Sequence, residues 1–150
     1  MDTSVLVAGA VNGAIFVGVS YALSRYTRQI LVAVLILAAL FYVYFAARAH
    51  AGAGWLAAEL VGVAIYGGMA WRGLRGSPWW IAAGWALHPI WDVPLHLFGP
   101  GHALAPASYA TACLTWDLVV AAVVAADAAR GWRMGAAPAL RTPARATRGA

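Results

Sequence analysis

The sequence predicts an all-α integral membrane protein, a bundle of five transmembrane helices, on three observations. Of the 150 residues, 63% are hydrophobic and only 10% are charged, whereas ordinary soluble domains are about 25% charged. The apolar residues form five segments, each about as long as a helix that crosses a bilayer. All ten basic residues are arginine, concentrated in connecting segments and at the C-terminus. We therefore expect one membrane domain over residues 1–130 and a disordered basic tail over 131–150.

The first predicted span covers residues 5–23. No basic residue precedes it, so we expect it to stay in the membrane rather than to be cleaved as a signal peptide. Gly9 and Gly13 lie four residues apart, which is typical of closely packed membrane helices. Asn12 places an amide in the middle of the same span.

The next two predicted spans cover residues 30–47 and 55–71. Tyr42 lies in an aromatic stretch at the end of the second span, a composition that is typical of the membrane interface. Glu59 lies inside the third span. A carboxylate is costly in lipid, so Glu59 is expected to face the bundle interior or a water-filled cavity.

The last two predicted spans cover residues 79–98 and 109–129. The fifth span carries Tyr109, Cys113 and Asp117 at steps of four residues. Because four residues turn a helix by about 40° beyond one full turn, these three side chains are expected to share one face.

The most informative pattern lies in the fourth span, where His88, Asp92 and His96 follow one another at steps of four. The same geometry predicts that they share a face. Pro89 and Pro94 lack the backbone N–H, so they should kink the helix and free carbonyl groups beside the ionisable side chains. Such a backbone is tolerated at membrane depth only where it is buried in protein or lines a wet cavity.

The arginines predict the orientation of the bundle through the positive-inside rule. With five spans, the first and third loops and the C-terminus share one side, and nine arginines fall there. Only Arg48 falls on the other side. The N-terminus is therefore expected outside and the C-terminus in the cytoplasm, with the arginine-rich tail attracting anionic lipid. This orientation places most of the polar residues within the spans in the outer half of the bilayer.

Polar residues at one depth on several helices indicate a shared pocket, and acid–base catalysis is the function we favour for it. Buried carboxyl and imidazole groups can hold and release protons near neutral pH. The expected catalytic residues are His88, Asp92, Glu59 and Asp117. The expected substrate-binding residues are Trp91, His96, Tyr109, Tyr42, Asn12 and Cys113. The expected substrate is an isoprenoid or sterol-like hydrophobic molecule that is isomerised, cyclised or hydrated without a bound cofactor.

Three alternatives remain open on the sequence. His88, Asp92 and His96 could hold zinc or iron, completed by Glu59 or Asp117. Acids and histidines at mid-depth are also typical of proton or ion transport, although these groups thin out toward the cytoplasmic half. The third alternative is a structural polar core. Nucleic-acid binding is not expected, and a homo-oligomer is compatible with the sequence.

The motif Gly84-Trp85-x-Leu87-His88-x-x-Trp91-Asp92-x-x-x-His96, followed by Gly99, Pro106, Ser108, Cys113 and Asp117, resembles a family of small bacterial integral membrane proteins of unknown function. The resemblance covers about residues 84–117 and implies a multi-pass protein of the bacterial cytoplasmic membrane. Two adjacent histidines often close the first motif in that family, and here Leu95 replaces the first of them. A looser architectural likeness is to five-helix sterol-isomerase-like membrane proteins.

Overall fold

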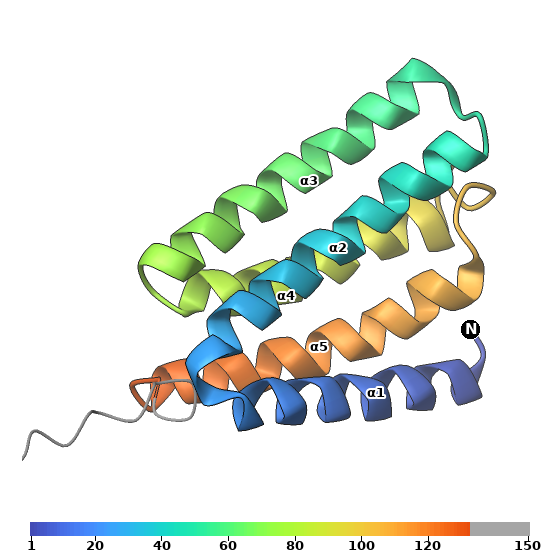
Figure 1. Ribbon diagram of the computed structural model, residues 1–150. Helices are drawn as coiled ribbons and strands as arrows, with labels where there is room; N and C mark the ends of the chain where they lie inside the picture. The colour runs from blue at the N-terminus through green and yellow to red at the C-terminus, as the bar shows by residue number, and fades with distance from the viewer. Residues whose placement is uncertain (133–150) are drawn as a thin grey trace, which may run out of the picture.

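The computed structural model describes residues 1–132, and this part of the chain is all-helical, as the sequence predicts (Figure 1). Four helices are long and apolar enough to cross a membrane, namely α1, α2 with the short turn before it, α3 and α5. The predicted disordered tail lies outside the described residues, except for residues 131 and 132. The helices are α1 (Thr3–Ala22), α2 (Thr27–Arg48), α3 (Gly52–Arg75), α4 (Trp79–Asp92) and α5 (Ala107–Ala129), with the short turns η1 (Ser24–Tyr26) and η2 (Val93–Leu97).

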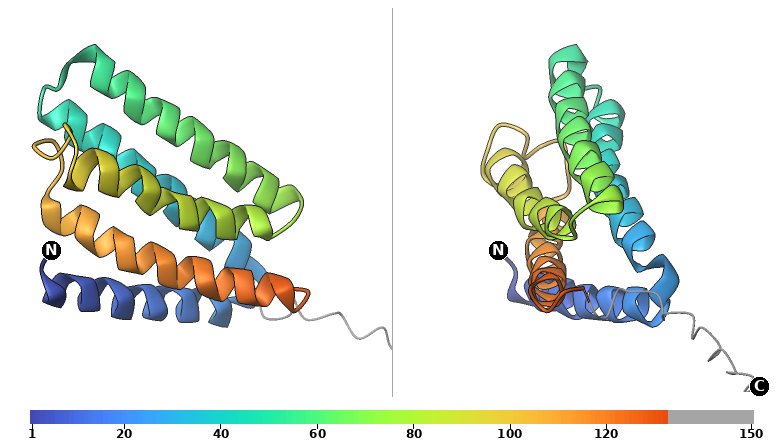
Figure 2. Two further views of the ribbon diagram at one scale, coloured as in Figure 1. Left: turned by 180° about the vertical axis from the view of Figure 1, so that it is seen from behind. Right: turned by 90° about the vertical axis from the view of Figure 1, so that its left-hand side faces the viewer.

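The helices pack in the spatial order α2, α3, α4, α5, α1, which differs from their order in the chain. Figure 2 shows α4 lying between the α2–α3 pair and the α5–α1 pair. Helix α1 contacts α2 mainly near the turn that joins them and otherwise lies along α5. The backbones of α2 and α5 do not approach each other. This gap between two helices that both border α4 becomes important for the site.

Glycines explain why α1 and α5 pack so closely. A Cβ atom at Gly9 would collide with the carbonyl oxygen of Ala112, and one at Gly13 would lie 2.9 Å from the carbonyl oxygen of Trp116. The two positions predicted to allow close packing therefore do so. Asn12, between them in sequence, lies on the exposed face of α1.

Side chains satisfy backbone groups at two helix ends that carry no intrahelical partner. At the start of α1, the backbone N–H of Ser4 donates to Asp2 at 2.8 Å. Hydrogen bonds from the Ser4 hydroxyl and backbone lower the pKa of Asp2. At the end of α3, Arg28 donates from Nη1 to the carbonyl oxygens of Gly73 and Gly76 at 3.2 and 2.9 Å. Arg28 thereby ties the start of α2 to the end of α3.

The fourth helix does not keep a regular α-helical path through its second proline. Pro89 lies inside α4, whereas Pro94 lies in η2, a π-helical turn in which the N–H of Phe98 donates to the carbonyl of Val93 at 3.1 Å. A π turn holds more residues per turn than an α-helix, so the expected step of 40° between Asp92 and His96 is not maintained. His96 consequently points toward α3, while His88 pairs with α5.

The described arginines divide between the two ends of the bundle. Helix α2 ends at Arg48, at the end of the bundle where the N-terminus lies (Figure 1). At the opposite end, Arg72 lies over the ring of Trp80 and Arg75 over the ring of Trp71, with 4.8 and 3.6 Å from guanidinium carbon to ring centroid. Arginine and tryptophan side chains of this kind are typical of a membrane–water interface. Which end faces the cytoplasm stays a prediction from the arginine count.

Candidate functional site

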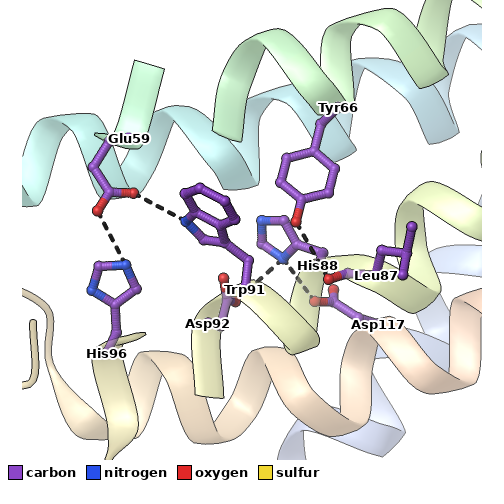
Figure 3. A network of polar contacts seen from close by, with 8 residues as sticks. All are labelled: Glu59, Tyr66, Leu87, His88, Trp91, Asp92, His96 and Asp117. Carbon is purple, nitrogen blue, oxygen red and sulfur yellow. Dashed lines mark hydrogen bonds and ion pairs between the residues drawn. The ribbon is translucent and has the colours of Figure 1, made fainter. Parts of the chain in front are cut away.

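Five ionisable side chains are buried in the centre of the bundle, each at most 2% exposed. They come from four neighbouring elements: Glu59 from α3, His88 and Asp92 from α4, His96 from η2, and Asp117 from α5. Figure 3 shows that they form two groups along the fourth helix. We name these the His88 cluster (His88, Asp92 and Asp117) and the His96 cluster (His96, Glu59 and Trp91).

In the His88 cluster, one imidazole nitrogen faces two carboxylates. His88 Nδ1 forms a hydrogen bond with Asp117 Oδ2 at 2.8 Å and lies 3.2 Å from Asp92 Oδ2. The second contact lacks hydrogen-bond alignment, so neither oxygen of Asp92 has a hydrogen-bond partner among the described residues. His88 Nε2 has none there either. Three ligating atoms, one from each side chain, lie within 4.8 Å of one another, the spacing of a potential metal site.

In the His96 cluster, one imidazole faces one carboxylate. His96 Nε2 lies 3.2 Å from Glu59 Oε1, and Trp91 Nε1 donates to Glu59 Oε2 at 3.4 Å. The ring of Tyr42 stacks on the His96 ring with 4.2 Å between centroids. The loop after η2 covers the remaining edge of the His96 ring, since a Cβ atom at Gly101 would lie 2.9 Å from His96 Nδ1.

Tyr66 adds a polar contact beside the His88 cluster. Its hydroxyl donates to the carbonyl of Leu87 at 3.3 Å, and its ring meets the His88 ring edge-on at 5.0 Å between centroids. Tyr66 is absent from the predicted site residues. Its spacing of seven residues from Glu59, two helical turns, is the sequence signal that identifies it.

An apolar cavity of about 240 Å³ lies between α2 and α5. It occupies the gap left because the backbones of these two helices do not approach each other. Trp85 of α4 also lines it, and Asp117 is its only lining carboxyl group. The lining residues are Val34, Leu37, Ala38, Phe41, Trp85, Tyr109, Ala112, Cys113, Trp116 and Asp117.

The structure brings most of the predicted site residues together, but not around one cavity. Asp117, Tyr109 and Cys113 line the apolar cavity. Glu59 and His88 instead border a gap between α2, α3 and α4 that is too narrow for a water molecule.

Three predicted site residues have surroundings that differ from the expected ones. Asn12 lies outside the site on the exposed face of α1. Trp91, expected to bind substrate, does not line the apolar cavity and donates to Glu59. In the alternative metal site the sequence grouped His96 with His88 and Asp92, whereas the structure places Asp117 there.

The cavity also involves residues that the sequence analysis did not select. Phe41, Trp85 and Trp116 supply most of its aromatic wall. Trp85 lies three residues before His88, one turn away on α4, and it belongs to the motif that resembles the membrane-protein family. The residues that α2 contributes to the cavity wall depend on the spatial order of the helices, so nothing in the sequence of α2 alone identifies them.

Comparison with known proteins gives a family but no activity. A family model described as "Family of unknown function (DUF6010)" matches residues 4–130. No curated protein matches the chain. No solved structure matches it either.

Proposed function

Because the chain belongs to this family of unknown function, we propose a function from the site itself: a membrane-embedded enzyme that performs acid–base chemistry on a hydrophobic small molecule. One observation carries the proposal. The apolar cavity between α2 and α5 contains a single carboxyl group, Asp117, which is hydrogen-bonded to a buried histidine, His88, at 2.8 Å. Apolar pockets with a few convergent polar groups are the usual form of small-molecule sites.

The walls of the cavity favour an uncharged, apolar substrate. Its lining is aliphatic and aromatic apart from Asp117 and the weakly polar Tyr109 and Cys113. A charged molecule would lose its hydration there without gaining a partner of opposite charge. A molecule dissolved in the bilayer can approach laterally between α2 and α5. An isoprenoid or sterol-like compound has this character. On the arginine count, we place the cavity in the outer half of the bacterial cytoplasmic membrane.

The geometry assigns separate roles to the members of the His88 cluster. Asp117 is the group that a substrate would meet, and His88 orients it and shares its proton. Asp92, which is also one of the expected catalytic residues, does not line the cavity. It lies 3.2 Å behind the same imidazole nitrogen, where it influences Asp117 through His88.

An isomerisation illustrates the chemistry without any further reactant. Asp117 in its acid form donates a proton to one carbon of a double bond, which leaves a carbocation on the neighbouring carbon. The rings of Trp85, Phe41 and Tyr109 border the cavity and stabilise such a cation through their π-electrons. The Asp117 carboxylate then removes a proton from the adjacent carbon, which moves the double bond and restores the starting protonation state.

The test is whether the cavity holds a hydrophobic molecule. The protein is purified in native lipid nanodiscs and its bound small molecules are identified by native mass spectrometry. Ala38→Phe places a ring inside the cavity, whereas Ala33→Phe adds the same ring on the exposed face of α2. We expect the bound molecule to disappear in Ala38→Phe and to remain in Ala33→Phe. Wild-type protein without such a molecule, or equal retention in both variants, would leave a structural polar core as the better explanation.

A further inference from the structure

We propose that the His88 cluster binds a divalent metal ion through His88 Nδ1 and one carboxylate oxygen each from Asp92 and Asp117. The inference goes beyond the proposed function and does not depend on it, because an ion can bind whether or not the cavity accepts a substrate. While Asp117 ligates the ion it cannot carry the acid proton, so the acid–base step described above belongs to the metal-free protein. The inference rests on the charge balance of the buried groups, on the surroundings of Asp92 and on the spacing of the ligating atoms.

The two clusters differ in their charge balance. The His96 cluster pairs one carboxylate with one imidazole, so it is neutral as an ion pair. The His88 cluster has two carboxylates for one imidazole, all at most 1% exposed. No arginine forms an ion pair with it among the described residues. A surplus negative charge is costly in such surroundings. A divalent cation with two carboxylates and a neutral imidazole has no net charge.

An extra proton would also balance the charge, but it does not explain Asp92. A protonated carboxyl donates its O–H, and an ionised one accepts several hydrogen bonds. Asp92 is fully buried and lies 3.2 Å from His88 Nδ1, but neither of its oxygens makes an aligned hydrogen bond within residues 1–132. Buried polar groups without a hydrogen-bond partner are uncommon, and binding of an ion is one recognised way to satisfy them. A buried carboxylate that shares its one imidazole with a second carboxylate and lacks an aligned hydrogen bond therefore points to a cation.

The spacing of the ligating atoms fits a small divalent ion. His88 Nδ1 lies 2.8 Å from Asp117 Oδ2 and 3.2 Å from Asp92 Oδ2. Tetrahedral ligands that each lie about 2.0–2.2 Å from zinc are about 3.3–3.6 Å apart, so these atoms need to separate by only several tenths of an ångström to hold the ion. Metal binding requires His88 Nδ1 to lose its proton. The hydrogen bond between His88 Nδ1 and Asp117 Oδ2 is then replaced by one bond from each of these atoms to the metal. A nitrogen and two carboxylate oxygens suit zinc, iron(II) or manganese(II). Three protein ligands also leave a coordination position open, as in catalytic zinc sites.

The test is a titration of the purified, chelator-treated protein with zinc chloride, followed by calorimetry. The protein carries no histidine tag, and His50 and His102, which are exposed, are replaced by alanine to remove competing ligands. We expect about one zinc per chain. Asp92→Asn keeps the side-chain shape and should weaken binding at least about 100-fold, since even neighbours of metal ligands contribute 10- to 100-fold. Asp127→Asn alters another fully buried carboxyl, on α5, and should bind zinc as the wild type does.

X-ray absorption on the zinc-loaded wild type keeps the test decisive if Asp92→Asn fails to fold. We expect a ligand shell of nitrogen and oxygen without sulfur. Folded wild-type protein that binds neither zinc nor manganese overturns the proposal, as do undiminished zinc binding in folded Asp92→Asn and a sulfur ligand from Cys113. Ala38→Phe, which fills the neighbouring cavity, should retain zinc. Zinc binding by this variant shows whether the metal proposal holds independently of the proposal that the cavity binds a substrate.

Discussion

His88 and His96 lie eight residues apart on the fourth helix, and both are almost completely buried, yet their surroundings differ. His96 has one carboxylate, a stacked tyrosine and a covering loop. His88 has two carboxylates, one of which lines an apolar cavity. The first arrangement is balanced and closed, whereas the second has a surplus acid and borders an apolar cavity. Burial alone thus does not identify a reactive histidine, and the balance of its partners is the more informative property.

The strongest test of this comparison is removal of the histidine from the balanced cluster. His96→Ala leaves Glu59 with only the Trp91 indole as a partner. Breaking a buried ion pair on one side costs about 3–5 kcal/mol, so we expect a loss of that size in the free energy of unfolding. SDS-induced unfolding in mixed micelles measures it. A loss below about 1 kcal/mol would show that Glu59 and His96 are not held as an ion pair.

A matched pair of amide substitutions then separates the two clusters. Glu59→Gln removes the only carboxylate beside His96, and we expect it to destabilise the protein by about 1–3 kcal/mol. Asp92→Asn removes the surplus carboxylate beside His88, so in metal-free protein we expect no loss of stability. Both free energies come from the same unfolding assay after treatment with a chelator. Equal destabilisation by the two substitutions would contradict the difference in charge balance.

The smallest expected effect compares two tyrosine hydroxyls. Tyr66 donates to the Leu87 carbonyl, whereas the Tyr42 hydroxyl has no hydrogen-bond partner among the described residues. Tyr66→Phe should therefore cost about 0.5–1.5 kcal/mol, and Tyr42→Phe should cost close to nothing while keeping its ring stacked on His96. A larger loss in Tyr42→Phe would reveal a partner for that hydroxyl. Unfolding measured on the two variants in parallel decides between these outcomes.

The sequence predicts the five helices and the burial of the ionisable residues because both follow from local composition. Apolar segments of membrane length identify the helices, and the cost of charge in lipid directs Glu59 and Asp117 inward. Gly9 and Gly13 also follow from local spacing. The sidedness of the bundle, by contrast, remains a prediction that reporter fusions at both ends of the chain can test.

The pairing within the site could not be predicted, because it depends on tertiary structure. The π-helical turn around Pro94 changes the direction of His96 and separates it from His88. The sequence predicts a kink at the prolines, but the spacing of four implies that the two histidines share a face. The cavity depends on the order in which the helices pack, since it forms where α2 and α5 stay apart. Neither feature leaves a signal in the spacing of residues along a single helix.

The proposal that Asp117 performs acid–base chemistry is tested most directly by hydrogen exchange. The hydrophobic molecule that co-purifies with the protein is incubated with it in heavy water, and deuterium incorporation at carbon is followed by mass spectrometry. The wild type should label the molecule, Asp117→Asn should be slower by about 10²- to 10⁴-fold, and Glu59→Gln by less than about tenfold. Labelling that is undiminished in Asp117→Asn, or that falls equally in both variants, would contradict the assignment of the chemistry to the His88 cluster.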